Sequence, residues 1–331
     1  MLVVLIAALS GPARASLTAV DQRLRIQDAW ELFGPELVAD WPGHTAEWYL
    51  PQRFRDVADT AALRRQRDQL LADAEVVCIT FPPPKRLVMR APHLRFVHQL
   101  PAGVSNLTRS DVWGSSVPVT SGRGAGSTVP IAEWAVAGML ALLKDFPRAF
   151  SQRSRGELDR RAFRGRQVAG KTLGVIGLGG IGREVARLGH ALGMRVVGTR
   201  RSEAPVEHVE TLYRPSQLHE VLRQSDVVVV AAQLTAETHH LLDQPAFAAL
   251  KAGALVINVA RGELIDESAM IDALRSGQVG GVALDVYEGE FDHPPPPELL
   301  AFDNVIFTPH TSGHTEQPLA GALGIFRENL R

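Results

Sequence analysis

The sequence contains a single cysteine, Cys78, among its 331 residues. One thiol cannot form an internal disulfide, and it cannot supply the several sulfur ligands of a cysteine-based metal cluster. Cys78 stands in the apolar run EVVCIT, and we interpret it as an inert buried thiol. A disulfide-stabilised fold is therefore excluded.

The chain also lacks an excess of charge of either sign. It carries 35 Lys and Arg residues against 36 Asp and Glu residues, for a net charge of -1. Such a balance provides neither a basic field for nucleic acid nor a polybasic membrane signal. No apolar stretch is long enough to span a bilayer. We therefore expect no nucleic-acid or membrane partner, and a cytoplasmic location.

The first residues, MLVVLIAAL, have two interpretations. They resemble a short signal-peptide core, with Ala13-Arg14-Ala15 as a small-residue cleavage site. However, no basic residue precedes the apolar run, and a β-branched run at the start of an α/β chain is more typical of a buried strand. We favour the strand.

Apolar, β-branched runs alternate with helical stretches along the chain, which indicates parallel sheets covered on both faces. A length of 331 residues favours two domains. In the first part, the predicted strands begin at Val3, Glu75 and Leu94. In the second part, they begin at Thr172, Met194, Asp226, Ala254, Gly280 and Asn304. The last six suffice for a complete dinucleotide-binding domain.

A Gly/Ser-rich segment, Ser121 to Thr128, marks the predicted domain boundary. The stretch that follows it, PIAEWAVAGMLALLKDF, is apolar nearly all round and predicts a helix buried between domains or against another subunit. A last helix, from about Glu316 to Arg331, is expected to pack on the first domain. We thus predict a discontinuous substrate-binding domain, 1–122 and 311–331, and a dinucleotide-binding domain, 123–310.

The glycines Gly177, Gly179 and Gly182 form a G-x-G-x-x-G pattern that follows the strand TLGVI and opens a helix. In this pattern the first glycine permits a tight turn, the second lets the backbone approach a pyrophosphate, and the third allows close helix–strand packing. The helix N-terminus then attracts the anion. We predict a dinucleotide site that includes Gly180 and Ile181, and the alternative is a glycine-rich turn without a ligand.

The end of the next predicted strand, GTRRS, distinguishes the two nicotinamide cofactors. An NAD site usually carries an acidic residue about 20 residues past the glycines. This chain has Arg200, Arg201 and Ser202 there instead, a cationic cluster suited to a 2′-phosphate. We predict NADP(H) in preference to NAD(H), and the alternative is a pair of solvated loop arginines.

Arg261, Glu290 and His310 each follow a predicted strand, and open α/β sheets bind ligands beyond such strand ends. Arg261 would grip a substrate carboxylate and polarise the neighbouring carbonyl group. His310 would donate and accept the proton, and Glu290 would orient the imidazole. The alternatives are a solvated turn, a surface charge and a strand cap. His310 and His314 have H-x₃-H spacing, but Ser312-Gly313 disfavours a helical zinc pair, so we predict no metal.

Six segments together are similar to one family. They are LPAGVSNL from Leu100, TVPIAEW from Thr128, GKTLGVIGLGGIG from Gly170, NVARGELIDE from Asn258, GGVALDVYEGE from Gly280 and DNVIFTPHTSGHT from Asp303. The chain resembles the D-isomer-specific 2-hydroxyacid dehydrogenases, especially their glyoxylate/hydroxypyruvate reductase-like branch. One departure is Phe291, because the family often has proline after the glutamate.

The resemblance implies that Arg261, Glu290 and His310 are catalytic. It also implies that the turn Ala102-Gly103-Val104 contacts the substrate carboxylate, and that Thr128, Ala260 and Asp285 lie at the cofactor. The implied fold is a Rossmann domain inserted into a flavodoxin-like substrate domain. The implied assembly is a homodimer with the interdomain helix in its interface.

We therefore predict an NADP(H)-dependent oxidoreductase that interconverts small 2-oxo acids and D-2-hydroxy acids. One alternative is oxidation of formate or phosphite on the same scaffold. Formate enzymes pair the histidine with glutamine, so Glu290 argues against that alternative. A second alternative is a dinucleotide-sensing binding protein, like the corepressors that share this fold.

Overall fold

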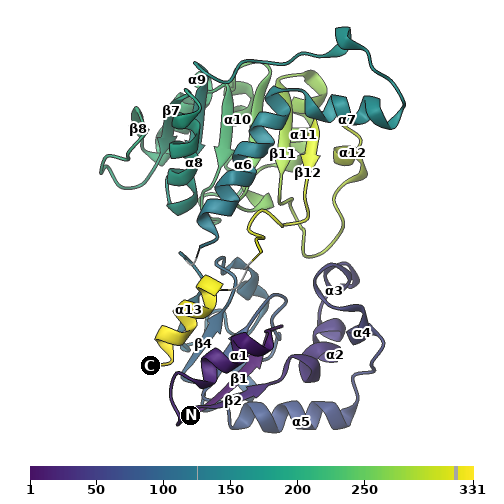
Figure 1. The fold of residues 1–331 in the computed structure, drawn as a ribbon, viewed down its shortest axis with the longest axis vertical. Helices are drawn as coiled ribbons and strands as arrows, with labels where there is room; N and C mark the ends of the chain where they lie inside the picture. The colour runs from purple at the N-terminus through teal and green to yellow at the C-terminus, as the bar shows by residue number, and fades with distance from the viewer. Residues whose placement is uncertain (125, 317–319) are drawn as a thin grey trace. The chain divides into compact units, whose positions relative to one another are not determined.

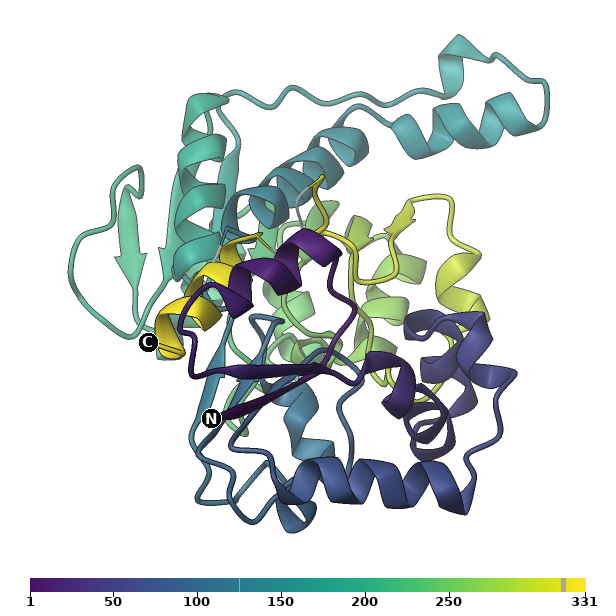
Figure 2. The same cartoon turned by 60° about the horizontal axis from the view of Figure 1, so that its bottom comes forward.

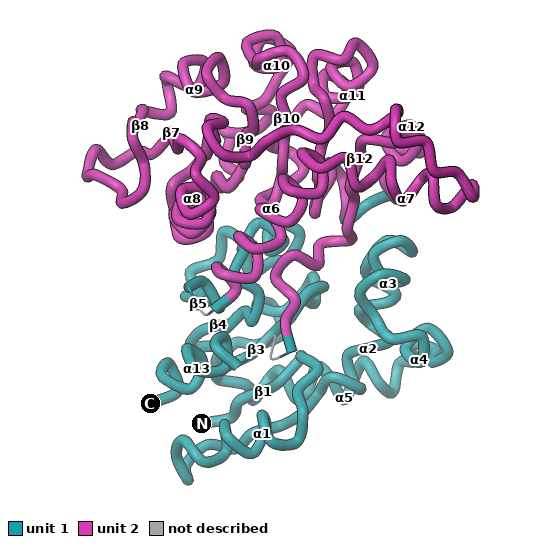
Figure 3. The backbone as a smooth tube through the Cα atoms, turned by 45° about the horizontal axis from the view of Figure 1, so that its top comes forward, with its two compact units in different colours: residues 1–126, 291–293, 316–331 teal, residues 127–290, 294–315 magenta. Residues whose placement is uncertain are grey.

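The computed structural model describes residues 1–124, 126–316 and 320–331. The chain forms two compact units (Figure 3). Unit 1 comprises Met1–Gly126, Phe291–His293 and Glu316–Arg331, and unit 2 comprises Ser127–Glu290 and Pro294–Thr315. These bounds differ from the predicted ones by a few residues. They also place the short segment 291–293 in unit 1, which we did not predict.

Unit 1 contains a parallel five-stranded sheet with the order β2-β1-β3-β4-β5. Its strands are β1 (Leu2–Ile6), β2 (Arg25–Asp28), β3 (Val76–Ile79), β4 (Phe96–Gln99) and β5 (Val119–Ser121). Its helices are α1 (Gly11–Thr18), α2 (Trp30–Asp40), α3 (Gly43–Tyr49), α4 (Gln52–Arg55), α5 (Ala61–Ala72) and α13 (Ala320–Asn329), with 3₁₀ turns η1 (Val88–Arg90) and η2 (Ser105–Arg109).

The sheet of unit 1 is covered on both faces (Figure 1). On one face, Val4, Val77 and Val97 pack against α2 and α5. On the other, Leu5 and Cys78 pack against α1 and α13. The run from Val3 is thus a buried strand. The edge strands β2 and β5 were missed, because partly exposed edges do not require an apolar run.

Cys78 lies in β3 between Leu5 of β1 and His98 of β4. Its side chain is fully buried, and this burial raises the pKa of the thiol above its ordinary range. The prediction of an inert buried thiol is therefore confirmed.

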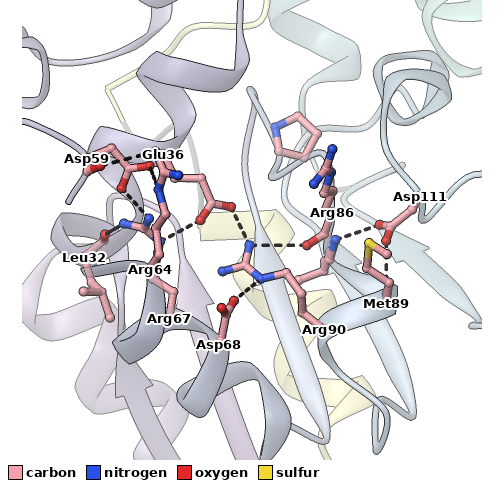
Figure 4. A network of polar contacts seen from close by, with 12 residues as sticks. Leu32, Glu36, Asp59, Arg64, Arg67, Asp68, Arg86, Met89, Arg90 and Asp111 are labelled. Atoms are coloured by element: carbon pink, nitrogen blue, oxygen red, sulfur yellow. Dashed lines mark hydrogen bonds and ion pairs between the residues drawn. The ribbon is translucent and has the colours of Figure 1, made fainter. Parts of the chain in front are cut away.

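A buried network of charged groups stabilises the outer helices of unit 1 (Figure 4). The Arg67 side chain on α5 is fully buried and lies 2.6 Å from a Glu36 carboxylate oxygen, and it also pairs with Asp59. Arg90 donates to Glu36 at 2.6 Å and to Asp68 at 2.7 Å. The opposite charges compensate each other in this network. Without its partner, a buried charge would cost several kcal/mol.

Unit 2 contains a parallel seven-stranded sheet with the order β12-β11-β10-β9-β6-β7-β8. Its strands are β6 (Thr172–Ile176), β7 (Arg195–Thr199), β8 (Thr211–Tyr213), β9 (Val227–Val230), β10 (Ala254–Asn258), β11 (Val279–Leu284) and β12 (Val305–Phe307). Six of these were predicted, and the short, half-exposed edge strand β8 was not. The α/β class with two parallel sheets is confirmed.

Helices cover both faces of the unit 2 sheet (Figure 1). They are α6 (Thr128–Leu143), α7 (Phe146–Ser154), α8 (Gly180–Ala191), α9 (Leu218–Gln224), α10 (Gln244–Ala249), α11 (Glu267–Ser276) and α12 (Pro297–Leu300), with 3₁₀ turns η3 (Arg160–Ala162), η4 (Pro215–Gln217) and η5 (Gly262–Leu264). Alternate residues of β10 show the two faces: Ile257 packs with the α6 and α8 side, and Val256 packs with α10 and α11. Among the described residues, no helix is long and apolar enough to cross a membrane.

The stretch predicted as one apolar helix, Pro130 to Phe146, corresponds to α6, which ends at Leu143, and only its last residue, Phe146, belongs to the next helix. Asp145 adopts a left-handed conformation (φ 59°) and separates α6 from α7. The α6 helix buries Ala135 and Met139 against unit 2, whereas α7 extends outward from that unit as an arm (Figure 2). Phe146 and Phe150 on this arm are 50% and 58% exposed.

We expect His98 to make the stability of unit 1 depend on pH. His98 is buried, stacks on Phe326 at 4.6 Å, and places Nδ1 2.8 Å from the Thr120 hydroxyl. Burial lowers the pKa of His98 from 6.5 to about 4. Between pH 6.5 and about pH 4, the His98 side chain is protonated in the unfolded chain but not in the folded chain. Stability should therefore fall as the pH drops from 6.5 towards 4.

Urea unfolding of the wild type and His98→Gln between pH 7 and 4.5 tests this dependence. The wild type should lose stability faster than the variant, by at most about 1.4 kcal/mol per pH unit. His93→Gln, which alters an exposed histidine, is the control. Parallel curves for the wild type and His98→Gln would contradict the prediction.

Candidate active site

The seven strands of unit 2 end in one row across the sheet. Neighbouring strands pair Tyr213 with Thr199, Thr199 with Ile176, Ile176 with Val230, Val230 with Asn258, Asn258 with Leu284, and Leu284 with Phe307. We call these seven residues the terminal row. Because the strands are parallel, every segment that follows the terminal row leaves the sheet at the same edge, the one formed by the carboxyl ends of the strands. The predicted glycine loop, Arg200, Arg261, Glu290 and His310 all lie on such segments.

His310 and Glu290 are brought together as predicted. Nδ1 of His310 lies 2.9 Å from Oε1 of Glu290. The Glu290 side chain is almost fully buried, whereas the His310 side chain is 31% exposed. Burial, together with the nearby carboxylates of Glu290 and Glu267, raises the pKa of Tyr287 above its ordinary value. The buried carboxylate fixes one ring nitrogen of His310, and the partly exposed ring keeps its other nitrogen for a second partner.

His310 does not end a strand, because β12 stops at Phe307. It instead has a left-handed backbone (φ 54°), which is uncommon for a residue with a Cβ. Its N–H donates to the Asp285 carbonyl oxygen at 2.8 Å. Backbone strain of this kind persists only where the surroundings over-determine it, and it is concentrated at functional sites.

The Asp285 side chain supplies those surroundings. Its buried carboxylate accepts hydrogen bonds from the Thr308 hydroxyl at 2.6 Å, from the Thr311 N–H at 2.7 Å and from the Ser312 N–H at 2.9 Å. Asp285 therefore holds the segment on both sides of His310. Its predicted place at the cofactor remains a prediction.

Arg261 follows β10 in a turn that Asn258 fixes. The Asn258 amide donates to the Arg261 carbonyl oxygen at 2.8 Å and accepts from the Ala260 N–H at 3.0 Å. The Arg261 guanidinium donates to the Ala260 carbonyl oxygen at 2.6 Å and is partly exposed. The turn thus places a permanent positive charge at the sheet edge that also carries Glu290 and His310.

The glycine loop has the shape that a dinucleotide requires. Gly177 has φ 97°, and a Cβ there would come within 2.8 Å of the Ala232 backbone. A Cβ at Gly182 would overlap the Gly177 carbonyl oxygen. By contrast, nothing lies within 4 Å of a Cβ built at Gly179. The first and third glycines therefore allow tight packing, and the second leaves open space at the N-terminus of α8.

Three other predicted cofactor residues lie near this loop or its edge. Thr128, the first residue of α6, is adjacent to Gly180, because a Cβ on that glycine would be 3.5 Å from the Thr128 hydroxyl. Ile181 lies in the first turn of α8, and Ala260 lies in the Arg261 turn. Each is thus at the edge where the glycine loop begins.

Arg200 and Arg201 follow β7 at the predicted place. Within the described ranges, neither guanidinium has a hydrogen bond or an ion pair, and Arg201 is exposed. The neighbouring Arg214, by contrast, is paired with Glu203. Ser202 accepts from the Ala204 N–H at 3.3 Å. The pKa of Glu237 is lowered by a Thr235 hydrogen bond and, to a smaller extent, by the Arg201 charge.

The predicted substrate residues Ala102, Gly103 and Val104 belong to unit 1. They form a partly exposed turn between β4 and η2, and the Gln99 side chain holds it by donating to the Gly103 carbonyl oxygen. In the same unit, the Phe291 ring packs against the Phe81 ring in a tilted arrangement, with the ring centroids 4.4 Å apart. The aromatic ring that replaces the family's usual proline therefore packs against the loop that begins at Phe81.

Two supporting residues were not predicted in these roles, Asn258 and Thr308. Both stand at or just after the end of an apolar strand. A polar side chain at such a position is not explained by apolar packing in the core. That position is a signal that the sequence offers. The particular hydrogen bonds, however, depend on how the neighbouring segments fold back.

Comparisons with known proteins identify the family of this chain. The family model described as "D-isomer specific 2-hydroxyacid dehydrogenase, NAD binding domain" matches residues 136–312. A D-3-phosphoglycerate dehydrogenase of Methanocaldococcus jannaschii is 34% identical over 74% of this chain and 46% of the relative. The chain thus spans about half the length of that relative.

Two further similarities extend over more of the other protein. A hydroxypyruvate reductase of Thermotoga maritima is 33% identical over 68% of this chain and 72% of the relative. A crystal structure of a D-isomer specific 2-hydroxyacid dehydrogenase from Xanthobacter autotrophicus Py2, in complex with NADPH and MES, is 28% identical with a TM-score of 0.74. The aligned region covers 99% of this chain and 93% of the Xanthobacter chain. The chain therefore belongs to the D-isomer-specific 2-hydroxyacid dehydrogenase family.

Proposed function

We propose that the protein is an NADP(H)-dependent oxidoreductase that interconverts small 2-oxo acids, of the glyoxylate or hydroxypyruvate type, and D-2-hydroxy acids. The observation that carries this proposal is the His310–Glu290 pair, which shares one sheet edge with Arg261 and the glycine loop. The similarity to a hydroxypyruvate reductase supports the substrate class.

The proposed chemistry assigns one task to each side chain. Arg261 binds the substrate carboxylate through its planar, permanently charged guanidinium and polarises the adjacent carbonyl group. His310 donates a proton from Nε2 to the carbonyl oxygen during reduction, and it accepts that proton during oxidation. Glu290 holds Nδ1 and stabilises the imidazolium. The nicotinamide, when bound, supplies or accepts the hydride.

A dinucleotide-sensing binding protein is the second candidate, because a sensor needs the glycine loop as much as an enzyme does. The two differ in turnover. An enzyme oxidises NADPH rapidly with at least one 2-oxo acid, whereas a sensor binds NADPH tightly and turns over none. The orientation of His310 by a buried carboxylate favours the enzyme, because binding alone does not require a positioned acid.

We expect His310→Ala to lower kcat by roughly 10²–10⁴, because it removes a positioned acid/base. Loss of NADPH absorbance with glyoxylate and hydroxypyruvate measures this effect. His314→Ala removes an exposed histidine four positions away and should retain turnover. Near-normal kcat in His310→Ala would eliminate the proposed role, provided that NADPH binding and the folded state are unchanged in both variants.

We further expect the protein to prefer NADPH to NADH. Replacing both Arg200 and Arg201 with alanine should raise KM for NADPH by at least about 10- to 100-fold, since the loss of even one charge-assisted contact costs roughly 1.5–3 kcal/mol. KM for NADH should change little, because NADH lacks the 2′-phosphate. Arg223→Ala on α9 is a control for the loss of an exposed arginine. Equal effects on both cofactors, or a preference of the wild type for NADH, would contradict the prediction.

The proposed assembly is a homodimer in which the α6–α7 region forms the interface. Four large apolar side chains of this region are exposed: Val129 at the start of α6, Phe146, Phe150 and, beyond α7, Leu158, which is 93% exposed. Exposed apolar patches of this kind are typical of interaction surfaces. Phe146→Glu combined with Phe150→Glu should therefore yield monomers.

Size-exclusion chromatography with light scattering measures the mass. Val57→Glu, at an exposed apolar position of unit 1, is the control and should remain dimeric. A monomeric wild type, or a double variant that remains dimeric, would contradict this interface.

A further inference from the structure

Two adjacent histidines and a glutamate bring three metal-binding side chains together in unit 2. His239 and His240 lie between β9 and α10, and Glu288 lies between β11 and Glu290. One ligand atom from each of the three lies within 4.8 Å of the others. The two imidazole rings are 4.0 Å apart, and Nε2 of His240 lies 2.9 Å from Oε1 of Glu288.

The backbone directs both histidines to the same place. Successive side chains point to opposite faces in a strand and diverge by about 100° in a helix, so neighbouring rings do not normally meet. Here His240 has a left-handed backbone (φ 51°). Its N–H donates to the Glu263 carbonyl oxygen at 2.8 Å, and the Leu242 N–H donates to the Leu264 carbonyl oxygen at 3.0 Å. These bonds keep the turn in a conformation that a residue with a Cβ rarely adopts.

The rest of the turn is also ordered before any ion binds. The Thr238 hydroxyl accepts from the Thr235 N–H at 2.8 Å and donates to the Gln233 carbonyl oxygen at 2.7 Å. On the opposite side, Gly262 packs so closely on the Tyr287–Glu288 peptide that a Cβ there would overlap it. The backbone on both sides is therefore fixed, and only side-chain rotations are needed to adjust the ligand atoms.

The donor set identifies the kind of ion. Two imidazoles and one carboxylate suit borderline divalent transition ions, whereas Mg²⁺ and Ca²⁺ prefer oxygen ligands. Zinc bonds of about 2.0–2.2 Å in a tetrahedron separate ligand atoms by roughly 3.3–3.6 Å, and the ligand atoms here lie within 4.8 Å of one another. The side chains of His240 and Glu288 are 35% and 34% exposed, and His239 is exposed, so a fourth position can be taken by water.

We propose that His239, His240 and Glu288 form a binding site for one divalent transition ion, with Zn²⁺ as the representative ligand. The site is separate from the His310–Glu290 pair and does not depend on the proposed reaction. It joins two segments directly, the turn after β9 and the segment after β11. The hydrogen bond from His240 to Glu263 extends it to the turn that carries Arg261. A bound ion therefore holds together the segments on which Arg261 and Glu290 stand.

Titration calorimetry of the tag-free, full-length chain with ZnCl₂ tests this site. We expect one saturable zinc ion per chain, no comparable heat with MgCl₂, and a higher unfolding temperature with zinc. His239→Ala, His240→Ala and Glu288→Gln should each weaken zinc binding by on the order of tenfold or more. His93→Ala, which removes an exposed histidine of unit 1, is the matched control and should bind as the wild type does.

Co²⁺ provides an independent readout, because a four-coordinate cobalt site absorbs visible light more strongly than the hydrated ion. The band should appear with the wild type and disappear with Glu288→Gln, a variant that keeps the side-chain volume. Two results overturn the site: no saturable zinc binding by the wild type, or zinc binding that the three variants leave unchanged while circular dichroism shows them folded. In either case the His240–Glu288 contact is a hydrogen bond only.

Discussion

The parallel register of the unit 2 sheet is the constraint on which the candidate site depends. All seven strands stop at the terminal row, so the chain leaves the sheet repeatedly along a single edge. Residues that are far apart in the sequence, such as Gly177 and His310, thereby follow the same edge. A change of one residue in any strand pairing would turn its side chains to the opposite face and shift the segment beyond it. Core packing on both faces of the sheet therefore also fixes the positions of the polar segments.

Register alone does not orient a side chain, and buried polar groups near the terminal row perform that task. Asn258 fixes the Arg261 turn, Asp285 holds the segment around His310, and Glu290 holds the imidazole itself. Each is nearly inaccessible to water, where an unsatisfied polar group costs free energy. Their hydrogen bonds are thus required for stability, and the same bonds position Arg261 and His310. Asn258, Asp285 and Glu290 are therefore required both for stability and for the proposed chemistry.

Much of this arrangement could be predicted from the sequence, because its strongest signals are local. Buried strands such as β9 and β10 appear as continuous apolar runs, and the glycine pattern between β6 and α8 requires a defined loop shape. The edge strands β2, β5 and β8 escaped prediction, since strands half open to solvent do not require apolar side chains. The break at Asp145 escaped as well, because nothing in the apolar pattern predicts a left-handed residue. The contact between His240 and Glu288 depends on how distant segments pack together. The spacing of residues in the sequence does not predict such packing.

The burial of Cys78 has a practical consequence. The molecule's sole thiol stands on the central strand β3 of a five-stranded sheet, with a strand on either side, and its side chain is covered by α1 and α13. An alkylating reagent reaches it only while those layers are parted. The rate of alkylation therefore reports how often unit 1 opens. The measurement requires no engineered label, and it does not depend on unit 2, which carries His310.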